Sequence, residues 1–194
     1  MNAQEFDALL ELLAMLVLDP RTAVLFALLV IASVSDYRSY RIPNWLTFGG
    51  AAFALVYKTT IAVSPPSAFL LAFGGLFLGF LIMLPPYALG VMGAGDVKLM
   101  AMVGAFVGAA TVLHAALYTL ILGGVLSLVF MMIQGVAAQV LANVRFLLTD
   151  WMLKLRSGQR AQLAPLAVTA ARLPYAVAIA SGSLVALCLP PLPW

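Results

Sequence analysis

Residues 93–140 read GAGDVKLMAMVGAFVGAATVLHAALYTLILGGVLSLVFMMIQGVAAQV. Within this segment a long apolar stretch starts directly after Asp96. As one helix, residues 97–140 would measure about 65 Å, roughly twice the thickness of a hydrocarbon core of about 30 Å. The stretch must therefore fold back on itself, and we place the turn between Gly108 and His114. Asp96 then lies at the mouth of a membrane span, where an ionisable side chain is costly and indicates a functional site.

The composition extends this conclusion to the whole chain. Hydrophobic residues make up 64% of the 194 residues and charged residues only 9%, and the mean hydropathy is +1.10. These values predict an all-α polytopic membrane protein, a bundle of about six transmembrane helices in a single membrane-embedded domain over residues 1–194. The predicted spans are residues 21–36, 44–63, 67–84, two within 97–140, and 173–189.

Two segments do not fit a transmembrane helix. Residues 1–19 place Asp7 and Glu11 on one face of a possible interfacial helix, and they lack the basic residues with which a signal peptide begins. Residues 141–172 mix many charged and polar side chains with Trp151 and several leucines. We expect this second segment to be cytoplasmic or interfacial.

Several kinds of function are disfavoured by the residue content. The chain has one Cys and one His, so it offers no zinc-site spacing and no intramolecular disulfide, and we expect no metal. The basic residues are scattered, which argues against a nucleic-acid partner. No stretch resembles a cofactor-binding motif, so we expect no cofactor, and the lipid bilayer is the expected surrounding. The oligomeric state is left open.

The basic residues also predict an orientation. If both termini lie outside, eight of the ten Lys and Arg residues fall on the cytoplasmic side, and only Arg21 and Lys58 fall outside. Asp36 ends the first predicted span and Asp96 begins the fourth, with two crossings between them. Both acids therefore reach the same, cytoplasmic face.

Two carboxylates at one depth suit acid–base hydrolysis. One carboxyl group is protonated and donates to a carbonyl oxygen, while the other is ionised and activates a water molecule. Gly93 and Gly95 have no Cβ, so they permit a sharp turn and close approach of a substrate beside Asp96. The structural alternative is that Asp36 and Asp96 only terminate helices or pair with nearby Arg or Lys.

Other residues have both a functional and a structural interpretation. Lys98 could stabilise a carboxylate or hold the substrate backbone, or it could be an interfacial lysine. Asn44 could hydrogen-bond near the first acid, or it could be the N-cap of the second span. We expect His114 to be structural. Pairs of small residues spaced by four allow close helix packing and occur at Gly75 with Gly79 and at Gly104 with Gly108.

Three stretches resemble the type IV prepilin peptidases, which are intramembrane aspartyl proteases with a Gly-x-Gly-Asp motif. They are DYRSYRIPN at residues 36–44, GAGDVKL at residues 93–99 and, more weakly, LPY at residues 173–175. The resemblance implies that Asp36 and Asp96 are the catalytic pair. It further implies cleavage after a glycine in the cytoplasmic leader of a prepilin or pseudopilin, in the bacterial inner membrane.

The chain also departs from the larger members of that family. Those members methylate the new amino terminus and carry an additional cytoplasmic domain with paired Cys-x-x-Cys motifs, which this sequence lacks. We therefore expect a peptidase without N-methyltransferase activity. The short length resembles the enzymes of tight-adherence (Flp) pilus systems, and archaeal preflagellin peptidases share the acids.

Two functions from other classes stay open. A small proton- or cation-coupled transporter would also use two intramembrane acids, but the last three spans offer few polar groups for a continuous path. A non-catalytic platform of a pilus machine would keep the acids only for packing or assembly. Asp→Asn changes distinguish these functions, because a scaffold should tolerate them and a protease should not.

Overall fold

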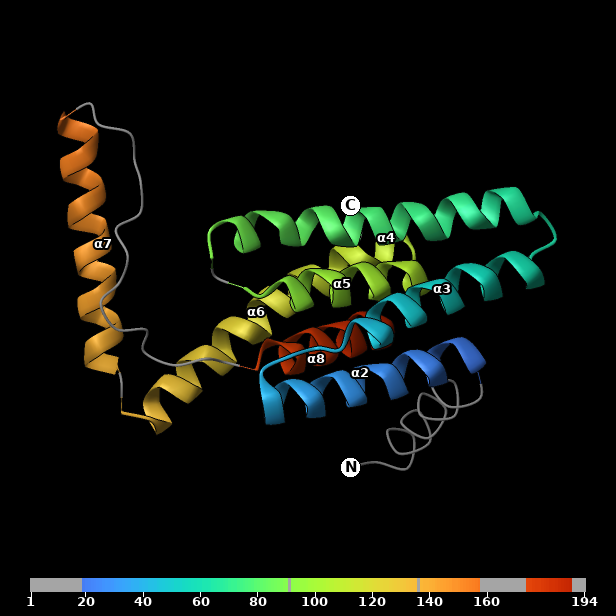
Figure 1. The fold of residues 1–194 in the computed structure, drawn as a ribbon, viewed down its shortest axis with the longest axis horizontal. Helices are drawn as coiled ribbons and strands as arrows, with labels where there is room; N and C mark the ends of the chain where they lie inside the picture. The colour runs from blue at the N-terminus through green and yellow to red at the C-terminus, as the bar shows by residue number, and fades with distance from the viewer. Residues whose placement is uncertain (1–18, 91, 136, 158–173, 190–194) are drawn as a thin grey trace. The chain divides into compact units, whose positions relative to one another are not determined.

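The computed structural model describes residues 19–90, 92–135, 137–157 and 174–189, and all regular structure among them is helical. This confirms the all-α prediction. Apart from Asp19, the predicted interfacial helix at residues 1–19 lies outside the described residues, as do residues 158–172. The helices, drawn in Figure 1, are α2 (Pro20–Ser39), α3 (Asn44–Ile61), α4 (Pro65–Ala88), α5 (Ala94–Val107), α6 (Ala109–Ile133), α7 (Ala137–Ser157) and α8 (Tyr175–Cys188).

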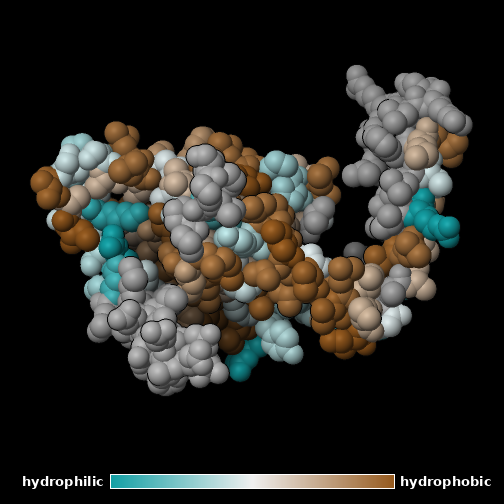
Figure 2. Space-filling view, turned by 180° about the vertical axis from the view of Figure 1, so that it is seen from behind, coloured by the Kyte–Doolittle hydropathy of each residue, from teal (hydrophilic) through white to brown (hydrophobic). Residues whose placement is uncertain are grey.

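The helices agree with the predicted spans in order and position. Helices α2, α4 and α6 are long and apolar enough to cross a membrane, and α8 is a shorter apolar helix. Large hydrophobic side chains are exposed on these helices, among them Leu70 and Leu71 on α4, and Figure 2 shows such side chains over much of one face. The protein is therefore an all-α polytopic membrane protein. The predicted total of about six crossings stays a prediction.

The long apolar stretch is interrupted where the sequence predicted a turn. Helix α5 ends at Val107, Gly108 adopts a φ of 88°, and α6 begins at Ala109 and runs back in Figure 1. A positive φ is readily adopted by glycine, which has no Cβ to clash with the backbone. The break lies at the first residue of the predicted interval. It leaves α5 with only 14 residues, or about 21 Å, which is shorter than a hydrocarbon core.

The chain divides into two compact units. The first comprises residues 1–123 and 174–194, and the second comprises residues 124–173. Within the second unit, residues 137–157 form the regular helix α7, so most of the segment expected to be cytoplasmic or interfacial is helical. Its contact with a membrane surface stays a prediction.

Helix α5 forms the centre of the first unit. Every residue from Val97 to Phe106 except Lys98 is buried, and α5 packs against α2, α3, α4 and α8. A Cβ on Gly75 would clash with the carbonyl oxygen of Gly104, and a Cβ on Gly104 would clash with that of Gly75. The two helix backbones are thus in direct contact, which confirms the prediction that these glycines allow close packing.

The last turn of α2 contains Asp36 and leads into the connection to α3. Tyr40 closes the helix in the left-handed region at φ 51°, and its N–H donates to the carbonyl oxygen of Asp36 at 2.8 Å. The hydroxyl of Ser35 donates to the carbonyl oxygen of Arg41, also at 2.8 Å. These hydrogen bonds turn residues 41–43 back across the end of α2, toward the start of α5.

Candidate active site

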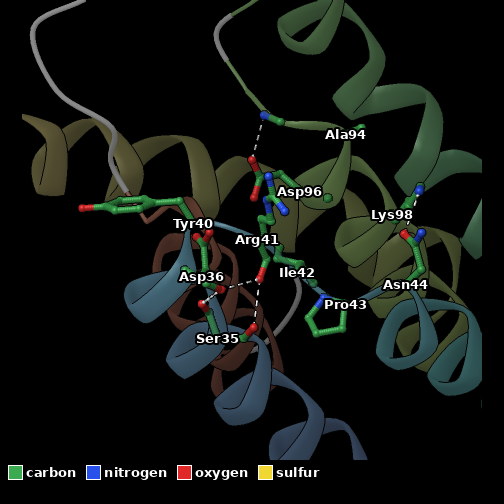
Figure 3. Close-up of a pocket in the computed structure, with 13 residues that line it drawn as sticks. Ser35, Asp36, Tyr40, Arg41, Ile42, Pro43, Asn44, Ala94, Asp96 and Lys98 are labelled. Carbon is green, nitrogen blue, oxygen red and sulfur yellow. Dashed lines mark hydrogen bonds between the residues drawn. The ribbon is translucent and has the colours of Figure 1, made fainter.

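One cavity brings together the residues that the sequence analysis selected. It has a volume of about 480 Å³ and is drawn in Figure 3. Asp36 comes from the last turn of α2, and Asp96 comes from the first turn of α5. The residues that line it are Ser35, Asp36, Ser39, Tyr40, Arg41, Ile42, Pro43, Asn44, Gly93, Ala94, Gly95, Asp96 and Lys98.

Asp96 is held by its own segment of backbone. Its side chain is at the third position of α5, and its Oδ2 accepts a hydrogen bond from the N–H of Gly93 at 3.0 Å. Acidic side chains are stabilised at this end of a helix, where N–H groups lack helical partners and the helix dipole is positive. The residue as a whole is only 8% exposed. The local segment Gly93–Asp96 therefore supplies the hydrogen bond that orients this carboxylate.

Asp36 is held by a distant part of the chain. Its Oδ2 accepts a hydrogen bond from the N–H of Ala176 at 3.0 Å, and the residue is 7% exposed. Ala176 lies in the first turn of α8, which starts directly after Pro174. Ala176 was not among the predicted site residues, although it directly follows the weak third motif at residues 173–175. A backbone N–H leaves no signature in residue type.

A glycine lets the two acid-bearing segments meet. A Cβ built on Gly95 would lie 3.2 Å from the Cβ of Ile42, which is tighter than ordinary van der Waals contact. A Cβ on Gly93 would instead lie 3.5 Å from Asp96 Oδ2, an ordinary contact distance. Gly95 therefore permits the connection after α2 to pack directly on the start of α5.

Lys98 and Asn44 form a polar pair at the edge of the cavity. The Nζ of Lys98 donates to Oδ1 of Asn44 at 2.8 Å and lies 5.3 Å from the centre of the Phe48 ring. The N-cap of α3 is Pro43, with no side-chain capping bond, so the interpretation of Asn44 as a helix cap is wrong. Asn44 instead fixes the position of a cation beside the acids.

Neither acid of the cavity forms an ion pair with any residue that the structure describes. The ion-pair form of the structural alternative therefore has no support among these residues, whereas Asp96 does cap the start of α5 by accepting from Gly93. Two buried carboxyl groups beside a polar cavity can share the work of a general acid and a general base. His114 takes no part, since it is buried in α6 and its Nδ1 lies 3.0 Å from the carbonyl oxygen of Ala110.

The described residues contain no group of three or more His, Cys, Asp or Glu side chains arranged to hold a metal ion. Among models of known protein families, one described as the type IV leader peptidase family matches residues 23–128, which include both acids and the Gly-x-Gly-Asp segment. No curated protein and no solved structure matches the chain.

Proposed function

Since the chain belongs to the type IV leader peptidase family, we propose that it is an intramembrane aspartyl endopeptidase whose catalytic residues are Asp36 and Asp96. The observation that supports this most is the common cavity. Two acids separated by 60 positions, each largely buried and neither ion-paired within the described residues, converge on one polar space of about 480 Å³. Burial of unpaired acids is costly, so their convergence favours a chemical role over a structural one.

The proposed reaction uses the two carboxyl groups in opposite protonation states. The ionised group accepts a proton from water while the water oxygen bonds to the scissile carbonyl carbon, and the protonated group donates to the carbonyl oxygen. The tetrahedral intermediate then collapses as the carbon–nitrogen bond breaks. The departing nitrogen takes the proton that the first carboxyl group had accepted, and the second group regains a proton from a hydroxyl of the intermediate, so both groups return to their starting states.

The remaining cavity residues suit the binding of an extended peptide. Gly93 presents backbone without a side chain beside Asp96, which leaves room for the substrate main chain, whereas Gly95 faces Ile42. Lys98 and Asn44 carry hydrogen-bonding groups at the same rim, where they can position substrate carbonyl and N–H groups. We propose that the substrate is the cytoplasmic leader of a Flp-like prepilin or pseudopilin, cut after a glycine at the cytoplasmic face of the inner membrane. We also propose that the enzyme does not methylate the product.

The test is cleavage of a co-expressed Flp-type prepilin, followed by gel mobility and mass spectrometry of the new amino terminus. We expect mature, unmethylated product with the wild type and none with Asp36→Asn or Asp96→Asn. Asp19→Asn is the matched control, since Asp19 lies at the opposite end of α2 and outside the acid cavity. It should process normally.

Three outcomes would contradict the proposal. Processing that survives Asp36→Asn or Asp96→Asn, at normal membrane levels of the protein, would remove that acid from the mechanism. Absence of processing by the wild type across several prepilins would favour transport or a scaffold role instead. A methylated product would contradict the expected lack of methyltransferase activity.

A further inference from the structure

We propose that the first turn of α8 is a positioning element for Asp36, acting through the backbone N–H of Ala176. This inference rests on the proposed function, because it assigns a role in the same reaction. The element lies 140 positions from Asp36 in the chain, and it falls outside residues 23–128 that the family model matches.

The hydrogen bond is buried and satisfies both partners. Ala176 is 0% exposed, and its N–H lies 3.0 Å from Asp36 Oδ2. N–H groups in the first turn of a helix have no partner within their own helix, so this donor would otherwise be buried without one. The carboxylate gains a donor at the positive end of a helix. The bond favours the ionised form of Asp36 and fixes the direction of its side chain.

A second contact joins the same residue of α8 to the same face of α2. The hydroxyl of Ser33 lies 3.4 Å from the carbonyl oxygen of Ala176, to which it donates. Ser33 and Asp36 are three residues apart, so they share one face of α2. Helix α2 therefore contacts both the N–H and the carbonyl group of Ala176, and a shift of α8 along α2 would disturb both contacts.

The start of α8 is also held from the side of α6. A Cβ built on Gly123 would lie 2.6 Å from the hydroxyl oxygen of Tyr175 and 2.9 Å from its ring. The Tyr175 ring thus occupies the space that a side chain at position 123 would need. Tyr175 directly precedes Ala176, so a side chain at Gly123 would have to displace the end of the Tyr175 side chain next to the donor residue. By contrast, a Cβ on Gly124 would meet nothing within 4 Å.

Other charges around Asp36 are unchanged by removal of this one donor. The titratable and charged groups that share its cavity are Tyr40, Arg41, Asp96 and Lys98, and α3 contributes only the neutral Asn44. From α8, the nearest titratable group in sequence is Tyr175. Loss of the Ala176 N–H alone should therefore alter the pH dependence of the reaction through Asp36, without a change in the net charge of the site.

The direct experiment replaces Ala176 with lactic acid by nonsense suppression in cell-free synthesis into lipid nanodiscs. This change converts one amide to an ester, so it removes the N–H and keeps the methyl side chain. We expect kcat for leader cleavage to fall about 10- to 100-fold, as for loss of a hydrogen bond to a charged group. The limb of the pH–rate profile that reports the ionisation of Asp36 should move upward by about one pH unit or more, with KM little changed.

The matched control is the same replacement at Ala186, a buried alanine farther along α8 that does not line the cavity. It removes a buried N–H that lies beyond the first turn of α8, where N–H groups bond within the helix, and it should leave the pH–rate profile in place. If the ester at position 176 gives the same kcat and pH profile as the ester at position 186, the positioning role is wrong. Failure of the wild type to cleave any prepilin would instead reject the proposed function itself.

A second variant tests the same role without altered backbone chemistry. Gly123→Val should displace the end of the Tyr175 side chain, lower kcat and move the same limb in the same direction, whereas Gly124→Val should resemble the wild type. A Gly123→Val enzyme with normal kcat and an unshifted profile would overturn the part of Tyr175 in holding α8 against Asp36. If Gly123→Val does not accumulate in the membrane, the ester at position 176 decides the question alone.

Discussion

Asp36 and Asp96 line the same cavity, but the chain holds them in different ways. Asp96 accepts its hydrogen bond from Gly93, three residues away, within the turn that starts α5. Asp36 accepts its hydrogen bond from Ala176, in a helix that enters the fold 140 residues later. The comparison shows that one acid can be oriented by a short motif, whereas the other depends on the assembly of the whole first unit.

The largest effect is expected where the helix of Asp96 packs on α4. Gly75→Ala should lower the free energy of unfolding by about 3 kcal/mol, because the new methyl group would meet the backbone of Gly104 and Gly108, which cannot move aside. Gly74→Ala is the matched control, since a Cβ there meets nothing within 4 Å. Thermal unfolding in detergent micelles measures both variants. Equal stability of the two would show that α5 does not need the backbone contact.

A smaller effect is expected where the two acid-bearing segments touch. Gly95→Ala should reduce leader cleavage about tenfold, because its methyl group would push Ile42 by a few tenths of an ångström and displace Asp36 relative to Asp96. In Gly93→Ala, the new methyl group would make only an ordinary contact with Asp96 Oδ2 at 3.5 Å. This variant should therefore lose less cleavage activity. The rates of leader cleavage by the two variants, measured at equal protein level, test this ranking. A Gly93→Ala enzyme that is the slower of the two would contradict this ranking.

Substitution of Lys98 or Asn44 should slow leader cleavage less than substitution of either acid. A double-mutant cycle with Lys98→Met and Asn44→Ala should give a coupling energy of about 1 kcal/mol, because the pair is linked by one hydrogen bond at 2.8 Å and is partly exposed. If the pair positions substrate, KM should rise several-fold while the pH–rate profile stays in place. Additive effects of the two changes, with unaltered KM, would contradict a shared role.

The smallest effect is expected at the other end of the helix that carries Asp36. Asp19 accepts a hydrogen bond from the N–H of Arg21 at 3.0 Å and pairs with its guanidinium at 2.8 Å. The side-chain hydrogen bond with Arg21 holds the pKa of Asp19 below its ordinary value of 3.8. A carboxyl group with a depressed pKa stabilises the folded state at pH values above its unfolded-state pKa. This contribution is lost as the pH falls through its folded-state pKa.

Asp19→Asn should therefore destabilise the protein by no more than about 0.5 kcal/mol at neutral pH, since the pair is exposed and Asn also caps helices. The difference from the wild type should vanish at pH values below the depressed folded-state pKa of Asp19. Unfolding midpoints at several pH values would measure it. A larger difference at low pH than at neutral pH would show that the sign is wrong.

The fold could largely be predicted from the sequence because hydrophobic length is a local property. Helices α2, α3, α4 and α8 lie close to predicted spans, and the break in the long apolar stretch occurs at Gly108, where the prediction began. Helix α7 was harder to predict. Its charged residues indicated an interfacial or loop segment, but charge content alone does not distinguish a surface helix from a loop.

The candidate site was predicted in its residues but not in its contacts. Asp36, Asp96, Gly93, Gly95, Lys98 and Asn44 all line the cavity. The pairing of Lys98 with Asn44 was not foreseen, and the capping interpretation of Asn44 was wrong. Both partners lie on different helices, so no spacing in the sequence could have joined them.

The sequence by itself determined the membrane class, the order of the helices and the local geometry of Asp96. These features depend on composition and on neighbours within one turn, where chain connectivity already holds the groups together. Only the tertiary structure decided that Ala176 holds Asp36, that Asn44 binds Lys98, and that Gly75 and Gly104 bring two backbones into contact. Those contacts join residues far apart in the chain, so they exist only once the packed helices have set the distances between them.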